Sequence, residues 1–161
     1  MQMPVPSLDA LQQSKELLAH IFSEIKRHDG KITFAKYMDL ALYTPELGYY
    51  NSSMQKFGAS GDFVTAPELS PLFSRCLAHQ CQEIFINLNG GDILEIGAGS
   101  GQMAADVLLA LAKAKTLPNH YYILELSADL KKRQQEKIAT LCPEFFDRVV
   151  WLYTLTDFNF Q

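Results

Sequence analysis

The feature that most constrains the fold of this chain is a glycine-rich segment, residues 92–101, with the sequence DILEIGAGSG. A short apolar run meets glycines at three alternate positions, and an apolar pattern with helical spacing begins at Gln102. A strand, a tight glycine turn and a helix in this order place a cofactor at the carboxyl end of a strand in an open α/β sheet. The glycines allow the turn and a close approach of ligand to backbone, and the new helix points free N–H groups and the positive end of its dipole at that ligand.

The spacing of the glycines narrows the type of cofactor. A dinucleotide-binding fold has its third glycine three residues after the second. Gln102 occupies that position here, and Gly101 follows Gly99 by two residues. An NAD-dependent redox enzyme is therefore the less favoured alternative. A glycine turn without any ligand also stays open, because short motifs of this kind occur by chance.

A second acidic residue strengthens the interpretation of the glycine segment as a cofactor site. Residues 120–125, with the sequence HYYILE, form another apolar run that ends in Glu125. At the end of a neighbouring parallel strand, a carboxylate can accept both hydroxyls of a ribose. Taken alone, Glu125 could equally be a helix-capping or solvated residue. Paired with the glycine turn, it favours a ribose-binding role.

Composition and charge exclude several classes of protein. A chain of 161 residues with 48% apolar residues can form a packed domain, or a domain with an appended helical segment. The net charge of −4 argues against a general nucleic-acid binder. Cys76, Cys81 and Cys142 lack C-x-x-C spacing and the four histidines are scattered, so neither a disulfide framework nor a metal site is expected. Without a secretory signal or an apolar stretch of the ~18 residues that a membrane span needs, we expect a cytoplasmic protein with no membrane partner.

Two helices are predicted before the first strand, and we expect them to flank the sheet. Ser7 can cap a helix that Gly30 closes, and a second helix runs from Thr33 to near Thr44, where Pro45 ends it. Residues 51–60 are polar and small, which is typical of a mobile loop.

The central part of the chain carries further helix signals. Thr65 and Glu68 fit a capping box, and a helix is predicted from Pro71 to about Asn87, with His79 as a half-buried packing residue. Its predicted apolar face consists of Leu72, Phe73, Cys76, Leu77, Ile84 and Phe85. A further helix is predicted from Ser127 to about Thr140, with the basic residues 131–133 and Lys137 on its solvated side, and residues 148–153 form a third strand.

Three motifs together resemble one enzyme family. They are ALYTPELGYY at residues 41–50, GDFVTAPELS at residues 61–70 and LEIGAGSG at residues 94–101. The chain resembles the MidA-like S-adenosyl-L-methionine (SAM)-dependent methyltransferases, relatives of the complex I assembly arginine methyltransferase. The first two motifs are distinctive of that family, whereas the third is shared by many methyltransferases. The resemblance implies an α/β fold: a Rossmann-like sheet whose first three strands are parallel (residues 61–161), preceded by a helical segment and loop (residues 1–60).

The resemblance also implies a cofactor and a set of site residues. SAM is the implied cofactor, with Glu125 on its ribose. The implied contacts are Gly61, Asp62, Phe63, Glu95, Gly97, Ala98, Gly99, Gly101, Glu125 and Leu126. A guanidinium nucleophile needs a carboxylate to hold it and take its proton. Asp62 and Glu68 are the candidates, and Asp62 is the predicted catalytic residue, because capping already accounts for Glu68.

The resemblance suggests a protein substrate, with an arginine side chain of a respiratory-complex subunit as the acceptor in the mitochondrial relative. Family members are more than twice as long, so the chain corresponds to an amino-terminal half. The alternative function is therefore an incomplete half that acts as a binding or assembly module, or that has no independent function. Its first strand would form an open sheet edge, and we expect the chain to self-associate.

Overall fold

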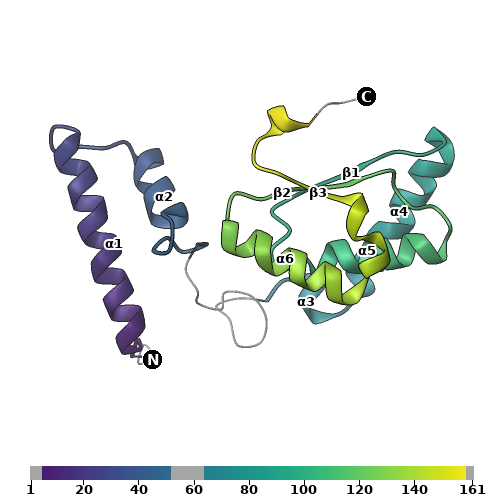
Figure 1. Ribbon diagram of the computed structural model, residues 1–161, viewed down its shortest axis with the longest axis horizontal. Coiled ribbons are helices and arrows are strands. Elements are labelled where there is room, and N and C mark those ends of the chain that lie inside the picture. The colour runs from purple at the N-terminus through teal and green to yellow at the C-terminus, as the bar shows by residue number, and fades with distance from the viewer. Residues whose placement is uncertain (1–4, 52–63, 159–161) are drawn as a thin grey trace. The chain divides into compact units, whose positions relative to one another are not determined.

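The computed structural model describes residues 5–51 and 64–158. The chain divides into two compact units, residues 1–54 and residues 55–161, and each is described by itself (Figure 1). Of the loop predicted at residues 51–60, residues 52–60 lie outside the described residues, as do Gly61, Asp62 and Phe63.

The first unit contains the two predicted helices, α1 (Leu8–Arg27) and α2 (Phe34–Tyr43). Both begin at side-chain caps. Ser7 Oγ accepts a hydrogen bond from the Ala10 N–H at 3.2 Å, and Thr33 Oγ1 accepts one from the Lys36 N–H at 3.1 Å. The helix boundaries predicted from these caps are confirmed.

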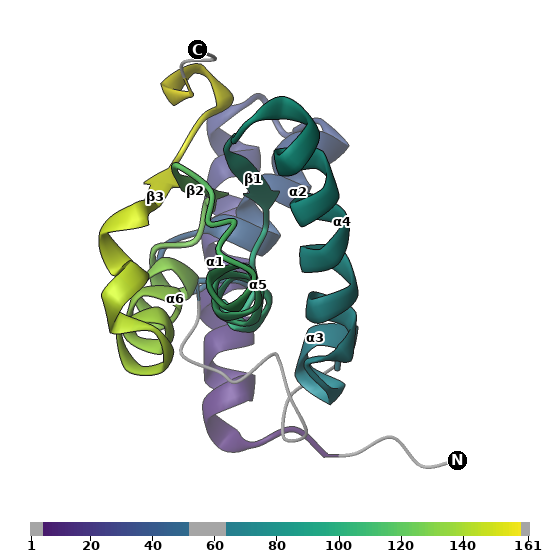
Figure 2. The same cartoon turned by 90° about the vertical axis from the view of Figure 1, so that its right-hand side faces the viewer.

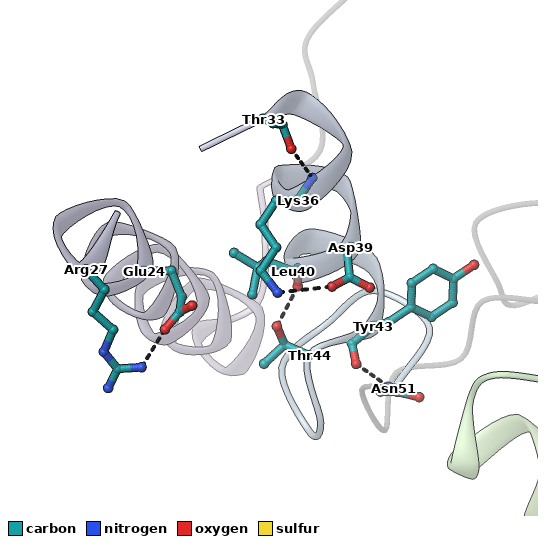
Figure 3. Close-up of polar contacts among 9 residues, drawn as sticks. All are labelled: Glu24, Arg27, Thr33, Lys36, Asp39, Leu40, Tyr43, Thr44 and Asn51. Atoms are coloured by element: carbon teal, nitrogen blue, oxygen red, sulfur yellow. Dashed lines mark hydrogen bonds and ion pairs between the residues drawn. The ribbon is translucent and has the colours of Figure 1, made fainter. Parts of the chain in front are cut away.

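The chain folds back on α2 after this helix ends. The N–H groups of Tyr49 and Tyr50 donate to the carbonyls of Ala41 and Leu42, each at 2.9 Å. Asn51 Nδ2 donates to the Tyr43 carbonyl at 2.6 Å, as Figure 3 shows. A Cβ at Gly48 would lie 2.6 Å from the Thr44 nitrogen, so this turn requires a glycine. The motif at residues 41–50 is therefore a compact structural unit built on the end of α2.

The second unit contains a parallel sheet of three strands, β1 (Ile93–Ile96), β2 (Tyr121–Leu124) and β3 (Val149–Leu152). The order β1-β2-β3 leaves β1 at one edge, and Ile93 is in register with Tyr121, which is in register with Val149. The helices of this unit are α3 (Ala66–Leu69), α4 (Leu72–Leu88), α5 (Gln102–Lys113) and α6 (Ala128–Leu141), with 3₁₀ turns at Pro143–Arg148 and Leu155–Asp157. The predicted fold class is confirmed.

The core of this unit lies between the sheet and α5. Figure 2 shows α5 and α6 on the same side of the strands. Leu108 and Leu111 of α5 are fully buried with Tyr121 and Ile123 of β2, and Ile138 joins them from α6. The alternation along β2, with residues 121 and 123 buried, is that of a strand covered on this face.

The predicted apolar face of α4 is wrong. Only Phe85 of the predicted set is buried, and the buried face consists of Phe85 with Ser74 and Ala78. The facing residues of α5, Ala104 and Ala105, are also small and fully buried. The two helices therefore pack closely through small side chains, and the larger apolar residues of α4 remain outside the contact.

His79 is also placed differently from the prediction. Its side chain is 66% exposed and lies 3.5 Å from the Glu83 carboxylate on the next turn of α4. It points away from the Ser74 and Ala78 face, so it is a surface residue rather than a half-buried packing residue. Across the described ranges, every helix is too short or too polar to cross a bilayer.

Candidate cofactor site

The glycine loop joins β1 to α5 through three left-handed residues. Gly97, Gly99 and Gly101 have φ values of 70°, 55° and 82°, which side chains with a Cβ rarely adopt. The Gly97 N–H donates to the Leu124 carbonyl at 3.0 Å, and the Gly101 N–H donates to the Ala98 carbonyl at 2.9 Å. The loop is thus anchored to β2 at its start and closed by a turn where α5 begins.

Glu125 lies directly after β2 and is 5% exposed. The Ser127 N–H donates to its Oε1, and Gln134 Nε2 donates to its Oε2, each at 2.9 Å. These are the hydrogen-bond partners of its carboxylate among the described residues. A carboxylate can accept about four hydrogen bonds, so Glu125 can accept a pair of hydroxyl groups in addition.

Glu95 is the buried carboxylate of β1, 8% exposed. Tyr121 donates its hydroxyl to Glu95 Oε2 at 2.8 Å. Burial raises the pKa of Glu95 to about 7; the Tyr121 hydrogen bond opposes this shift and the charge of Glu125 adds to it. The same burial and the neighbouring carboxylate raise the pKa of Tyr121. Glu95 therefore titrates near neutral pH while bonded to a core tyrosine.

Gln134 of α6 connects the loop to the carboxylate. Its Nε2 donates to the Gly99 carbonyl at 3.0 Å as well as to Glu125, and its Oε1 accepts from Trp151 Nε1 of β3 at 3.0 Å. The sequence analysis missed this residue. A signal was present, because Gln134 lies between Leu130 and Ile138 in the apolar stripe of its helix.

A second polar cluster surrounds Ser100. Ser100 donates its hydroxyl to the Glu68 carboxylate, and Lys137 Nζ lies 3.1 Å from both Ser100 Oγ and Gln102 Oε1. The capping box predicted for Glu68 is wrong, because Thr65 makes no side-chain cap within the described residues and the carboxylate is used by Ser100. Lys137 is likewise part of this cluster and does not merely lie on a solvated helix face.

The described members of the predicted site lie together at the carboxyl ends of the strands. Gly97, Gly99, Gly101 and buried Ala98 form the loop, and Glu95 and Glu125 lie at the ends of neighbouring strands. Leu126 is exposed directly after Glu125. In residues 5–51 and 64–158, no group of His, Cys, Asp and Glu side chains could hold a metal ion.

Comparison with known proteins identifies the family. Residues 76–161 match the family described as "Putative S-adenosyl-L-methionine-dependent methyltransferase". The chain belongs to this family. The resemblance to MidA-like methyltransferases is confirmed, and SAM is the cofactor of the family.

The relatives that this chain matches include curated and solved proteins. The protein arginine methyltransferase NDUFAF7 of Danio rerio, a mitochondrial protein, is 32% identical over 130 residues, which is 76% of this chain and 30% of the relative. Its mitochondrial homologue in Caenorhabditis elegans is 36% identical over 119 residues, 70% of this chain and 28% of the relative. The chain spans about 30% of the length of these relatives.

The fold also matches a crystal structure from Burkholderia thailandensis that contains S-adenosyl-homocysteine. The TM-score is 0.84 and the identity 41%, covering 95% of this chain and 41% of the other. A native crystal structure from the same organism matches with a TM-score of 0.77, at 41% identity, over 96% of this chain and 39% of the other.

Proposed function

We propose that this chain is the cofactor-binding part of a SAM-dependent methyltransferase that acts on a protein side chain. The observation that carries the proposal is the position of the glycine loop and Glu125 at the carboxyl ends of neighbouring strands, joined by one side chain. The match to a protein crystallised with S-adenosyl-homocysteine supports it.

The residues present fit this cofactor. A Cβ built at Gly97 would meet no atom within 4 Å, so there is open space beside the start of the loop. The start of α5, next to the glycine loop, is the positive end of the helix dipole, which suits a carboxylate such as that of a methionine moiety. Glu125 has acceptor capacity for the two ribose hydroxyls, and exposed Leu126 offers apolar contact beside it. Bound SAM supplies a methyl group made electrophilic by its sulfonium.

The acceptor that we propose is an arginine side chain, because the curated relatives are named protein arginine methyltransferases. A guanidinium is protonated at neutral pH, so a carboxylate is needed to orient it and take its proton. We assign this role to Asp62, which lies outside the described residues. The carboxylate of Glu68 accepts a hydrogen bond from Ser100, which makes Glu68 the weaker candidate. A respiratory-complex subunit as substrate rests on the family resemblance alone.

Calorimetric titration of the chain with SAM, S-adenosyl-homocysteine and NAD tests the cofactor. We expect binding of the first two and none of NAD. Glu125→Ala should weaken SAM binding roughly ten- to a hundredfold, because a hydrogen bond to a charged group contributes ~1.5–3 kcal/mol. Glu136→Ala, at an exposed position of α6, is the matched control and should leave the affinity unchanged. Equal affinity in a folded Glu125→Ala variant would remove this residue from the site.

A second candidate function is an assembly module without activity of its own. The observations in its favour are the edge position of strand β1 in the described sheet and the large apolar residues that are exposed on α4. Methyl transfer to arginine-containing peptides, measured with labelled SAM, separates the two candidates. The named relatives are mitochondrial, so they do not support the cytoplasmic location expected from the sequence, which stays a prediction.

A further inference from the structure

Gln134 is fully buried, at 0% exposure, and each end of its amide has defined partners. The two N–H groups of Nε2 go to the Gly99 carbonyl and to Glu125 Oε2, and Oε1 accepts the indole N–H of Trp151. If the amide were flipped, its oxygen would face two acceptors, the Gly99 carbonyl and Glu125 Oε2, and its nitrogen would face a donor, the Trp151 N–H. The orientation of this side chain is therefore fixed by its surroundings.

The hydrogen bond to Gly99 sets the orientation of a peptide in the loop. In a trans peptide, the carbonyl and the following N–H point in opposite directions, and the described residues contain no cis bonds. Because the Gly99 carbonyl points to Gln134, the N–H of Ser100 points away from α6. Gln134 thus determines where one backbone donor of the glycine loop is aimed.

The backbone of Gln134 is also held against the loop. A Cβ at Gly101 would lie 3.1 Å from Gln134 Cα and 3.3 Å from its Cβ and Cγ. Only a glycine allows α6 to approach this closely. The helix, the loop and Glu125 are consequently in direct contact around one residue, so a shift of any of them moves the others.

We propose that Gln134 is a positioning residue for the cofactor: it holds the Gly99–Ser100 peptide and the Glu125 carboxylate in the mutual geometry that binds SAM. Being fully buried, it acts through these two groups and touches no ligand. This inference rests on the proposed function and assigns a role to a residue outside the glycine motif and the acidic strand end.

The main variant is Gln134→Glu, which keeps the size of the side chain and the acceptor for Trp151 but replaces both donors. The new charged carboxylate would face that of Glu125, and SAM affinity should fall about tenfold or more at about pH 8. Gln134→Met, of similar length and uncharged, should weaken binding to a similar extent and decides the question if Gln134→Glu does not fold. Glu136→Ala, at an exposed position of the same helix, is the control, because it leaves all three hydrogen bonds of Gln134 in place.

The pH dependence gives a readout that a merely structural role would not change. Among the described residues, the ionisable groups of this network are Glu125, Glu95, Tyr121, Lys137 and Glu68. Burial and the adjacent Glu125 carboxylate both favour a protonated carboxyl, so lowering the pH from about 8 to about 6 shifts the pair toward a shared proton, which restores one O–H donor between positions 134 and 125. The affinity ratio of Gln134→Glu to wild type should therefore recover at least severalfold at the lower pH, whereas the ratio for Gln134→Met, which cannot titrate, should not.

The outcomes separate this inference from the proposed function. If wild type binds neither SAM nor S-adenosyl-homocysteine, the proposed function fails and the positioning role fails with it. If wild type binds and folded Gln134→Met binds equally well, only the positioning role is overturned. A loss that Glu136→Ala reproduces in full, or one that is independent of pH in Gln134→Glu, would also overturn it. Weakened binding in both Gln134 variants, with recovery at low pH and a near-normal control, supports it.

Discussion

The two sides of the glycine loop differ in how fully their residues are paired and covered. On the α6 side, buried polar groups are paired with one another: Gln134 with Glu125, Gly99 and Trp151. On the α4 side, β1 pairs only with β2 among the described strands, and Ile96 is 69% exposed. Other exposed apolar residues on this side belong to α4 and are Leu72, Phe73, Leu77, Ile84, Ile86 and Leu88.

The difference shows that the two sides depend on different parts of the protein. The polar groups of the α6 side are satisfied by residues within the same unit, so its geometry is set locally. An open strand edge and exposed large apolar side chains each favour contact with further polypeptide. Cofactor binding and association should therefore respond to separate sets of substitutions.

The largest effect is expected where the loop meets α6. Gly101→Val places a branched side chain at a φ of 82°, with its Cβ 3.1 Å from Gln134 Cα. Both the backbone strain and the contact displace the loop, so calorimetry should detect no SAM binding while circular dichroism retains most of the helical signal. We expect the same result for Gly99→Val, at a φ of 55°.

Gly30→Val is the matched control for this prediction. Gly30 has a φ of 80°, but a Cβ there would meet no atom within 4 Å. This variant carries the backbone strain without the contact with α6, so it should retain SAM binding. Normal SAM affinity in Gly101→Val would show that the loop tolerates displacement and is only a structural turn.

The next prediction concerns the α4 side. We expect the chain to self-associate through β1 and the exposed residues of α4, and Ile96→Lys combined with Ile84→Lys should shift it toward monomer in sedimentation velocity. Leu155→Lys is the control, since Leu155 is exposed in the final 3₁₀ turn and lies outside this surface. A wild-type chain that sediments as a monomer at every concentration would refute the prediction.

The buried carboxylate Glu95 lies in β1, between the two sides. Its titration should change the free energy of unfolding as the pH changes. Its pKa is raised from 4.5 to about 7 in the folded chain, so the folded state binds more protons than the unfolded state between these values. The stabilising contribution of protonated Glu95 is complete below about pH 4.5 and is lost as the pH rises through 7. The change is on the order of 3 kcal/mol.

Urea denaturation over a series of pH values measures this contribution. Glu95→Gln cannot ionise and still accepts the Tyr121 hydroxyl, so its free energy of unfolding should fall less between about pH 5 and 8 than that of wild type. Parallel curves for the two proteins would mean that Glu95 does not titrate in this range.

The smallest effect is expected at the cluster around Ser100. Ser100→Ala removes the hydroxyl that Glu68 and Lys137 share but leaves the backbone of the loop in place. A single hydrogen bond of this kind contributes about 1 kcal/mol, so SAM affinity should fall about fivefold. Thr140→Ala, at an exposed position of α6, serves as the control in the same titration. A loss as large as that of Gly101→Val would place Ser100 in direct contact with the cofactor.

Features that depend on neighbouring residues in sequence could be predicted from the sequence. Ser7, Thr33 and Ser127 cap the helices that they were expected to cap, and the glycines at alternate positions adopt the left-handed turn. The order of strands and helices follows from the same local signals, because each apolar run and each cap acts over a few residues.

Features that depend on a distant partner could not be predicted in this way. Which face of α4 is buried depends on Ala104 and Ala105 of α5, and α4 carries apolar residues on more than one face. The role of Glu68 depends on Ser100, 32 residues away, and that of Gln134 on Gly99, 35 residues away. Spacing within one helix does not reveal such pairs.

The position of Trp151 has a practical consequence. It is the one tryptophan of the chain, and its indole N–H is bonded to the side chain that joins the glycine loop to Glu125. Indole emission depends on the polarity and hydrogen bonding around the ring, so the intrinsic tryptophan fluorescence of the protein arises beside the glycine loop where we propose that the cofactor binds. Ligand titrations and rapid-mixing experiments can follow events there with an optical probe that the protein already contains, and no dye needs to be attached.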